Sequence, residues 1–193
     1  MNEAIWGLIG IGVGWLLSEF SSFMKSEEEN KSLEKNLKIL LKSEFFENKE
    51  LLNHYYEGIV EGVDEENIID RKNKYVQKLC KNPLPEFSRI AYKSQLTTMG
   101  RVFKKNEISS LIRIYSRFSQ LQNIYLAIKK KQDENNEAGR LAQKSGTSFS
   151  SLIVGHNPNY YYSEMRDLWD IFVNEKEDII STNLDEIFIL EID

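Results

Sequence analysis

Apolar residues dominate the start of the chain, where charged residues are almost absent. Residues 5–17 are an uninterrupted apolar run, and the next strongly charged stretch begins at Lys25. A helix needs about 20 residues to cross the hydrocarbon core of a bilayer, and residues 4–24 supply that length with Glu19 as their only charge. Because lipid cannot satisfy free backbone amides and carbonyls, helix is the backbone form expected here. The pattern predicts a transmembrane helix over residues 1–25.

Two other interpretations of this stretch are a cleaved signal peptide and a buried helix of a soluble protein. A signal peptide carries a basic segment before its apolar run and a small-residue cleavage site after it. This N-terminus instead holds Glu3, no Lys or Arg, and no A-x-A pattern. A buried soluble helix is disfavoured by the four glycines within residues 7–14, since glycine destabilises a helix interior in water. We therefore expect a retained anchor.

Basic residues predict the orientation of the anchor. None precedes the apolar run, and five follow it on the C-terminal side: Lys25, Lys31, Lys35, Lys38 and Lys42. Lys and Arg close to a membrane span stay on the cytoplasmic side. The pattern predicts a single-pass protein of a bacterial inner membrane, with its N-terminus outside and residues 26–193 in the cytoplasm.

Small residues form a stripe along the predicted span. At about 100° per residue, five of them fall within a sector of about 80°: Gly7, Gly10, Gly14, Ser18 and Ser21. Such spacing lets two helix backbones approach closely in lipid, as in the GxxxG dimer pattern. The alternative is that glycine is simply common in membrane helices. We expect the stripe to be a helix-packing interface of a homo-oligomer.

Glu19 is the ionisable residue within the span, and it lies about 100° from the nearest edge of the small-residue stripe. An ionisable side chain inside a bilayer normally faces protein or water. Glu19 is therefore a candidate for lining a pore. Alternatively, it sits at the headgroup level just past an interface marked by Trp6 and Trp15.

Apolar positions at three- and four-residue steps predict helices along the rest of the chain. The expected helices cover residues 26–63, 64–80, 86–103 and 107–131, and a last long helix begins at Pro158. Residues near 130–150 are polar and contain glycine, which indicates a loop or a weak helix. The expected fold is all-α: one N-terminal transmembrane helix (1–25) followed by a cytoplasmic bundle of about five helices (26–193).

Composition limits the chemistry of this body. A net charge of −5 gives no strong signal for nucleic-acid binding. Cys80 is the single cysteine, which excludes an intrachain disulfide and fits a reducing cytoplasm. The two histidines, His54 and His156, are well separated in sequence and show no metal-site spacing. We expect no metal and no cofactor.

Motifs of catalysis are missing from the sequence, which has no P-loop, no G-x-G-x-x-G, no G-x-S-x-G and no zinc-protease helix. We therefore expect that the protein is not an enzyme. An unusual cluster opens the last predicted helix: His156, Asn157, Tyr160 and Tyr161. Tyrosine is favoured at interfaces, so the cluster predicts a subunit contact or a degenerate ligand site, with an asparagine-capped turn as the alternative. His54 is the other candidate, on a helix whose pattern is otherwise structural.

A small helical body behind one N-terminal membrane helix resembles the membrane-anchored ancillary proteins of type VI (RNA-targeting) CRISPR loci. Their bodies are divergent versions of the HEPN helical domain. The resemblance covers the architecture of the whole chain and implies an oligomeric pore that strengthens antiphage defence. HEPN ribonucleases carry an arginine, four to six residues, and then a histidine. Neither histidine satisfies this pattern. The possible arginine positions before His54 are occupied by Glu47, Asn48 and Lys49, and those before His156 by Phe149, Ser150 and Ser151.

These patterns predict a self-associating membrane protein that acts as an oligomeric pore or membrane-perturbing effector, accessory to antiphage defence. Its partners would be the bilayer, further copies of the chain, and a cytoplasmic protein or RNA-guided effector. Two alternatives remain open: a membrane-tethered scaffold that recruits a cytoplasmic partner, and a ribonuclease with an atypical site at His54 or His156.

Overall fold

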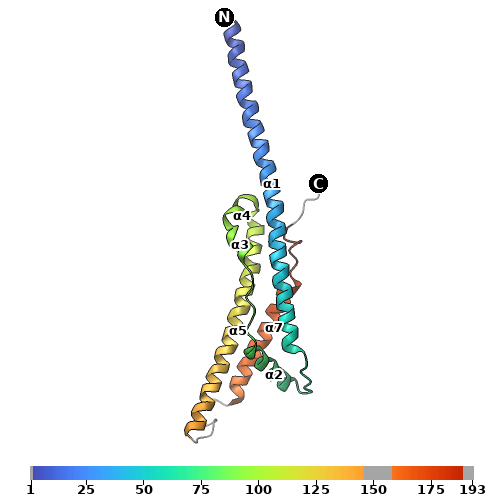
Figure 1. Ribbon diagram of the computed structural model, residues 1–193, viewed down its shortest axis with the longest axis vertical. Coiled ribbons are helices and arrows are strands. Elements are labelled where there is room, and N and C mark those ends of the chain that lie inside the picture. Colours follow the sequence, from blue (N-terminus) through green and yellow to red (C-terminus); the bar gives the residue numbers. More distant parts are fainter. Residues whose placement is uncertain (1, 146–157, 189–193) are drawn as a thin grey trace.

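The computed structural model describes residues 2–145 and 158–188, and within them the side chains of residues 18–19, 21–144 and 163–188. The described residues form helices and no strand, so the predicted all-α class is confirmed. The helices are α1 (Asn2–Val60), α2 (Ile68–Lys81), α3 (Ile90–Ser94), α4 (Leu96–Val102), α5 (Lys105–Ser145) and α7 (Pro158–Ser181) (Figure 1).

Helix α1 runs without a break for 59 residues, which at 1.5 Å per residue is about 90 Å. Its N-terminal half projects beyond the other helices, and its C-terminal half belongs to the bundle (Figure 1). The stretch that joins the two halves, residues 25–36, contains no Gly or Pro. Ion pairs one turn apart support it, with Lys31 Nζ 3.4 Å from Glu27 Oε1. The predicted boundary near residue 25 is therefore not marked by any break in the helix.

No helix is long and apolar enough to cross a bilayer among the residues whose side chains are described. The apolar run at residues 5–17 carries the prediction of a membrane span, and its side chains lie outside the described part of the chain.

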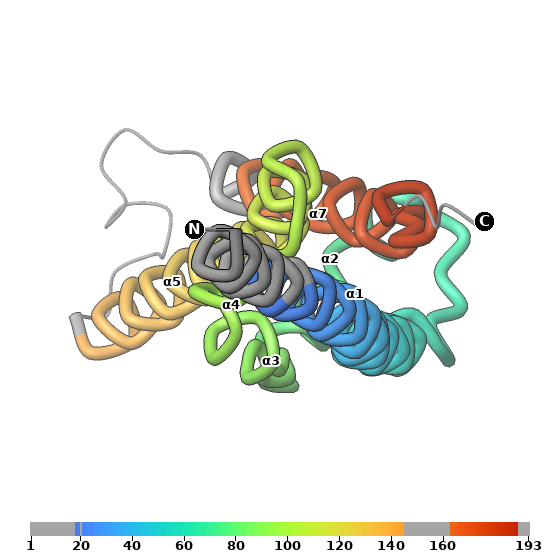
Figure 2. Tube along the Cα trace, turned by 90° about the horizontal axis from the view of Figure 1, so that it is seen from above, coloured from blue at the N-terminus to red at the C-terminus, as the bar shows by residue number. Residues whose placement is uncertain are grey.

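Three long helices make up the bundle. The C-terminal half of α1 and helix α5 run in the same direction, and α7 returns antiparallel to both, while α2 crosses the far end (Figure 1). Viewed from the projecting end, α3 and α4 lie on one side of α1 and α7 lies on the other (Figure 2). The buried side chains include Leu41, Phe45 and Leu52 from α1, Leu79 from α2, Leu111, Phe118 and Leu121 from α5, and Met165 and Phe172 from α7.

Helix α5 is longer than predicted. The loop or weak helix expected near residues 130–150 is helical as far as Ser145, and residues 146–157 lie outside the described chain. Buried Ile128 is followed at seven-residue steps by Asn135 and Ala142, which are also buried. The polar Asn135 and the small Ala142 thus continue the inward face of α5, so the helix extends through a segment of polar composition.

The helix predicted over residues 86–103 is two short helices. Gln95 (φ −108°, ψ 7°) ends α3 and begins α4. Residues 83–89 ahead of them are not helical, and Pro83 and Pro85 disfavour helix at the residue before each of them. The amide of Asn48 on α1 instead pairs with the backbone of Ser88 in both directions, at 2.8 Å for each hydrogen bond. The segment therefore docks as an extended strap against α1.

Candidate functional site

The candidate residues on the projecting half of α1 are exposed wherever they are described. Ser18, Glu19 and Ser21 all lie on the surface of the single chain. Gly7, Gly10 and Gly14 fall within the helical backbone of α1, in the part whose side chains are not described. The structure thus places the small-residue stripe on a helix that stands clear of the bundle (Figure 1).

Of the two histidines, the structure describes His54. His54 is 75% exposed on α1, and its Nδ1 lies 3.6 Å from Glu57 Oε2 one turn further on. His156 and Asn157 lie outside the described chain, and Tyr160 and Tyr161 lie on α7 without described side chains. The predicted subunit contact or degenerate ligand site at these residues stays a prediction.

Glu44 is a buried carboxylate that the sequence pattern did not predict. It lies on the inward face of α1 and accepts four hydrogen bonds from three other parts of the chain: from Ser88 Oγ (3.1 Å), the Ala91 amide (2.7 Å), the Tyr92 amide (3.3 Å) and Tyr115 Oη (2.8 Å). The two amides belong to the first turn of α3, where a negative charge is favourable. A sequence signal for it existed, because Glu44 stands three residues after Leu41 at a core position of the stripe.

The donors around Glu44 define its chemistry. Burial raises the pKa of Tyr115 well above its usual range, and the hydrogen bond to Glu44 raises it further. The ring of Tyr115 stacks on that of Tyr92 with centroids 4.2 Å apart. All the donors point at the carboxylate from the protein itself, so Glu44 is arranged to hold the strap and α3 against α1 rather than to move a proton to a substrate.

A buried ion pair holds the start of α5. Lys38 Nζ lies 2.6 Å from Glu34 Oε1 and 3.4 Å from buried Glu107 Oε1. Burial alone would lower the pKa of Lys38, but the hydrogen bond to Glu34 and the charge of Glu107 outweigh it, so the pKa is raised. The other oxygen of Glu107 accepts a 2.7 Å hydrogen bond from the Lys104 amide, which caps the first turn of α5.

The chain that follows α7 is clamped by lysines of α1. Lys42 pairs with Asp185, and Lys49 Nζ donates to the Thr182 carbonyl at 3.1 Å. Phe188 is completely buried beneath this clamp, with Lys38 Nζ 5.5 Å from its ring centroid. Lys38 and Lys42, two of the lysines on which the predicted orientation rests, thus also hold the end of the chain against α1.

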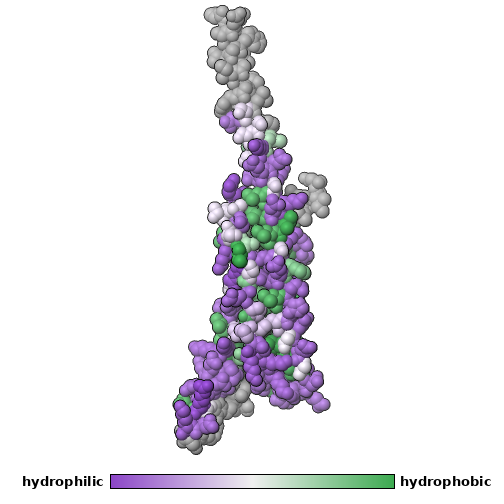
Figure 3. Space-filling view, viewed as in Figure 1, coloured by the Kyte–Doolittle hydropathy of each residue, from purple (hydrophilic) through white to green (hydrophobic). Residues whose placement is uncertain are grey.

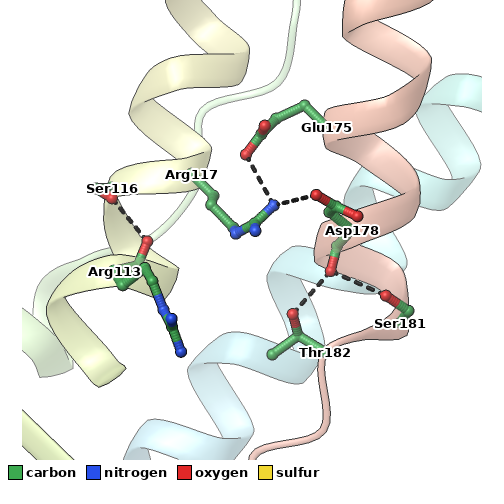
Figure 4. A network of polar contacts seen from close by, with 7 residues as sticks. All are labelled: Arg113, Ser116, Arg117, Glu175, Asp178, Ser181 and Thr182. Atoms are coloured by element: carbon green, nitrogen blue, oxygen red, sulfur yellow. Dashed lines mark hydrogen bonds and ion pairs between the residues drawn. The ribbon is translucent and has the colours of Figure 1, made fainter. Parts of the chain in front are cut away.

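Helices α5 and α7 are joined by the polar network drawn in Figure 4. Arg117 on α5 reaches Glu175 Oε1 at 3.3 Å and Asp178 Oδ2 at 2.7 Å on α7. The Asp178 carbonyl accepts hydrogen bonds from Ser181 Oγ (3.2 Å) and Thr182 Oγ1 (2.8 Å), which satisfies a carbonyl at the helix end. This network fastens α7 to α5 and satisfies a backbone carbonyl at the end of α7.

A pocket of about 290 Å³ lies between α2 and α5 beside Cys80. Burial raises the pKa of Cys80 to about 11, and the charge of Asp133 adds to the shift while Lys129 opposes it. A thiol with a raised pKa holds little of the thiolate that would act as a nucleophile. Nothing at the pocket therefore indicates covalent catalysis.

Across the described part of the chain, no three His, Cys, Asp or Glu side chains gather as a metal site would require. Comparison with protein-family models, with curated proteins and with solved structures gives no match to the chain. The resemblance to CRISPR ancillary proteins and to the HEPN fold stays a prediction.

Proposed function

We propose that the protein is a single-pass membrane protein that associates with copies of itself through α1 and acts as a pore or membrane-perturbing effector. The observation that carries the proposal is the unbroken course of α1 from the apolar N-terminal run into the bundle core. Because α1 is unbroken, a rearrangement of the membrane helices would move the body, and a rearrangement of the body would move the membrane helices. The proposed role as an accessory to antiphage defence rests on the architectural resemblance alone.

The continuity of α1 relates the small-residue stripe to the body. At about 100° per residue, the stripe centred on Gly14 falls about 180° from the buried face that carries Leu41. Two copies that met along the stripe would therefore keep their bundles on opposite outer sides of the pair, where they do not collide. Ile39 and Phe46 continue the same face into the body and are 57% and 62% exposed. Their exposure supports contact along much of α1.

Glu19 falls on the other side of α1, the side that carries the body. In the pore form of the proposal, Glu19 lines the lumen, and the bundles, which lie on the same side of α1, stand over its inner mouth. Without a lumen, Glu19 sits among the headgroups and the assembly perturbs the membrane in another way. The two forms share the helix-packing interface and differ in whether ions pass.

Disulfide cross-linking tests the proposed interface. In a Cys80→Ser background, Ser21→Cys lies on the stripe and Phe23→Cys lies about 160° away from it around α1. Both native residues are exposed in the single chain, so accessibility to an oxidant is matched. In native membranes we expect the Ser21→Cys variant to form dimers efficiently and the Phe23→Cys variant to form few. Equal cross-linking of the two variants would contradict the proposed face.

A membrane-tethered scaffold is the second candidate. It is favoured by exposed apolar side chains on the body away from α1, among them Ile112 and Leu126 on α5, since exposed apolar surface can serve as a docking site. A scaffold needs its body at the membrane but does not need this particular anchor. Retained function after replacement of residues 1–24 by an unrelated membrane helix would favour the scaffold over the self-associating effector.

A further inference from the structure

The segment that carries α3 and α4 has an unusual charge for this chain. Residues 89–106 contain five basic residues and no acidic one, although the whole chain carries a net charge of −5. Four of the five basic residues are exposed: Lys93, Arg101, Lys104 and Lys105. The remaining one, Arg89, donates to Ser119 Oγ at 2.8 Å. The segment is therefore a cationic patch on an acidic protein.

Three carboxylates near this patch are engaged within the fold, and a fourth, Glu86, is exposed and lines a pocket with Arg89 and Lys93. Glu107 is buried against Lys38 and the Lys104 amide. Glu44 is buried against α3. Glu34 pairs with Lys38 at 2.6 Å. The five basic residues of the segment outnumber the one exposed carboxylate, Glu86, so the patch keeps a net positive charge.

Exposed apolar side chains lie within the same segment. Ile90 on α3 is 78% exposed and Leu96 on α4 is 48% exposed. Figure 3 shows apolar surface gathered on the part of the bundle where α1 passes α3 and α4. A surface that mixes Lys and Arg with exposed aliphatic side chains is typical of segments that lie on an anionic membrane.

The patch lies at the end of the bundle nearest the projecting half of α1 (Figure 1). The turn between α4 and α5 is level with Lys38, whose Nζ lies 5.9 Å from the Phe103 ring centroid. Lys38 follows Lys25 by 13 residues, or about 20 Å of helix. Membrane helices tilt by up to about 40°. A tilt of α1 toward α3 and α4 would therefore bring the basic side chains to the headgroups.

We infer that the α3–α4 end of the bundle docks on the anionic cytoplasmic leaflet, with α1 tilted toward that side. This inference rests on the proposed membrane anchorage. It adds a second membrane contact to the body and fixes how the bundle stands relative to the bilayer. Positive charge on the patch and negative charge on the lipid surface are the complementary features that select this partner.

The test uses the full-length chain reconstituted into phosphatidylcholine vesicles with or without about 30% phosphatidylglycerol, because cationic segments respond to anionic lipid. A fluorophore is placed by Thr97→Cys in a Cys80→Ser background, and quenching by headgroup spin-labelled lipid reports its proximity to the surface. Two charge-reversal sets are compared: Arg101→Glu, Lys104→Glu and Lys105→Glu on the patch, and Lys129→Glu, Lys130→Glu and Lys144→Glu further along α5.

We expect strong quenching in anionic vesicles only. It should be lost in the patch variant, kept in the α5 control, and abolished in about 1 M salt, where the screening length falls to about 3 Å. Equal quenching in neutral and anionic vesicles would overturn the inference. So would RNA binding that depends on the patch without any lipid quenching. If the protein stays with the vesicles after alkaline extraction but shows no quenching, only the proposed docking is contradicted. If alkali extracts the protein, the proposed membrane anchorage itself is contradicted.

Discussion

Glu44 connects more of the fold than any other polar side chain among the described residues. Its carboxylate accepts hydrogen bonds from the strap, from the first turn of α3 and from Tyr115 on α5. Asn48, one turn further along α1, holds the strap through Ser88. The two residues occupy inward positions of α1 where an apolar side chain is usual, because the strap and α3 present backbone donors there that need a partner.

The first prediction concerns Glu44→Ala. The change would leave the Tyr115 hydroxyl and the first amides of α3 without an acceptor in a buried place, at about 1–3 kcal/mol for each unsatisfied group. We expect the free energy of unfolding in urea to fall by about 3 kcal/mol and α3 to exchange its amide hydrogens faster. Glu47→Ala, on the exposed side of the same helix, is the matched control and should change stability by less than about 0.5 kcal/mol. Equal effects of the two changes would refute this role of Glu44.

The second prediction concerns Cys80, whose pKa is raised to about 11. Relative to a thiol at its ordinary pKa, we expect iodoacetamide to label native Cys80 about 100-fold more slowly at pH 8, because the thiolate fraction is smaller by that factor. Urea-unfolded protein is the control. Because the folded pKa lies above the unfolded one, the stability that this group contributes is present below about pH 9 and is lost as the pH rises toward about 11. Fast labelling of the folded protein at pH 8 would contradict the raised pKa.

At the scale of the elements, helix periodicity in the sequence predicted most of the long helices. The stripe of α5 from Leu111 to Ile128 is buried as expected, and so is most of the stripe of α1 from Leu37 to Ile59, although Leu40 is 46% exposed. The long helix predicted to begin at Pro158 is α7. The helix predicted over residues 64–80 is α2, which begins later, at Ile68, where Asn67 caps it by accepting a 2.8 Å hydrogen bond from the Ile69 amide. The local pattern of apolar residues was sufficient to predict a helix wherever the buried face of that helix is apolar.

The sequence did not predict the elements whose structure depends on distant partners. Residues 130–145 are helical although their inward positions are polar or small, as at Asn135 and Ala142. The break at Gln95 has no proline or glycine to mark it. It falls where α3 ends after docking on Glu44, a contact between residues more than forty positions apart. Periodicity within one segment cannot report such a contact.

The third prediction concerns the face of α1 that carries Glu19. If Glu19 lines a lumen, Glu19→Leu should remove a charge from the ion path and change single-channel conductance or ion selectivity in planar bilayers. The oligomer should persist, because Glu19 lies off the small-residue stripe. Gly12→Leu, on the same side of the helix and within the apolar run, is the control for added bulk without loss of charge. Unchanged ion flux in the Glu19→Leu variant would rule out the lumen-facing position.

At the scale of the whole molecule, the two ends of the long axis differ in character. One end is a bare helix with an apolar run, and the nearest end of the bundle carries the basic α3–α4 segment (Figure 1). The side of α1 that faces away from the bundle aligns with the small-residue stripe. The proposed anchor, a cationic surface close to it, and a free helix face are the features that a membrane-bound assembly of many copies would need.

The mass of the full-length protein in mild detergent tests the central claim most directly, by light scattering with the detergent mass subtracted. The proposed function predicts a discrete oligomer of the 22.6 kDa chain. The double variant Gly10→Leu and Gly14→Leu should fall to the monomer mass, because bulky side chains keep the helix backbones apart, and Gly12→Leu should keep the oligomer. A monomeric wild-type protein, or an oligomer that survives the double variant unchanged, would contradict self-association through this face of α1.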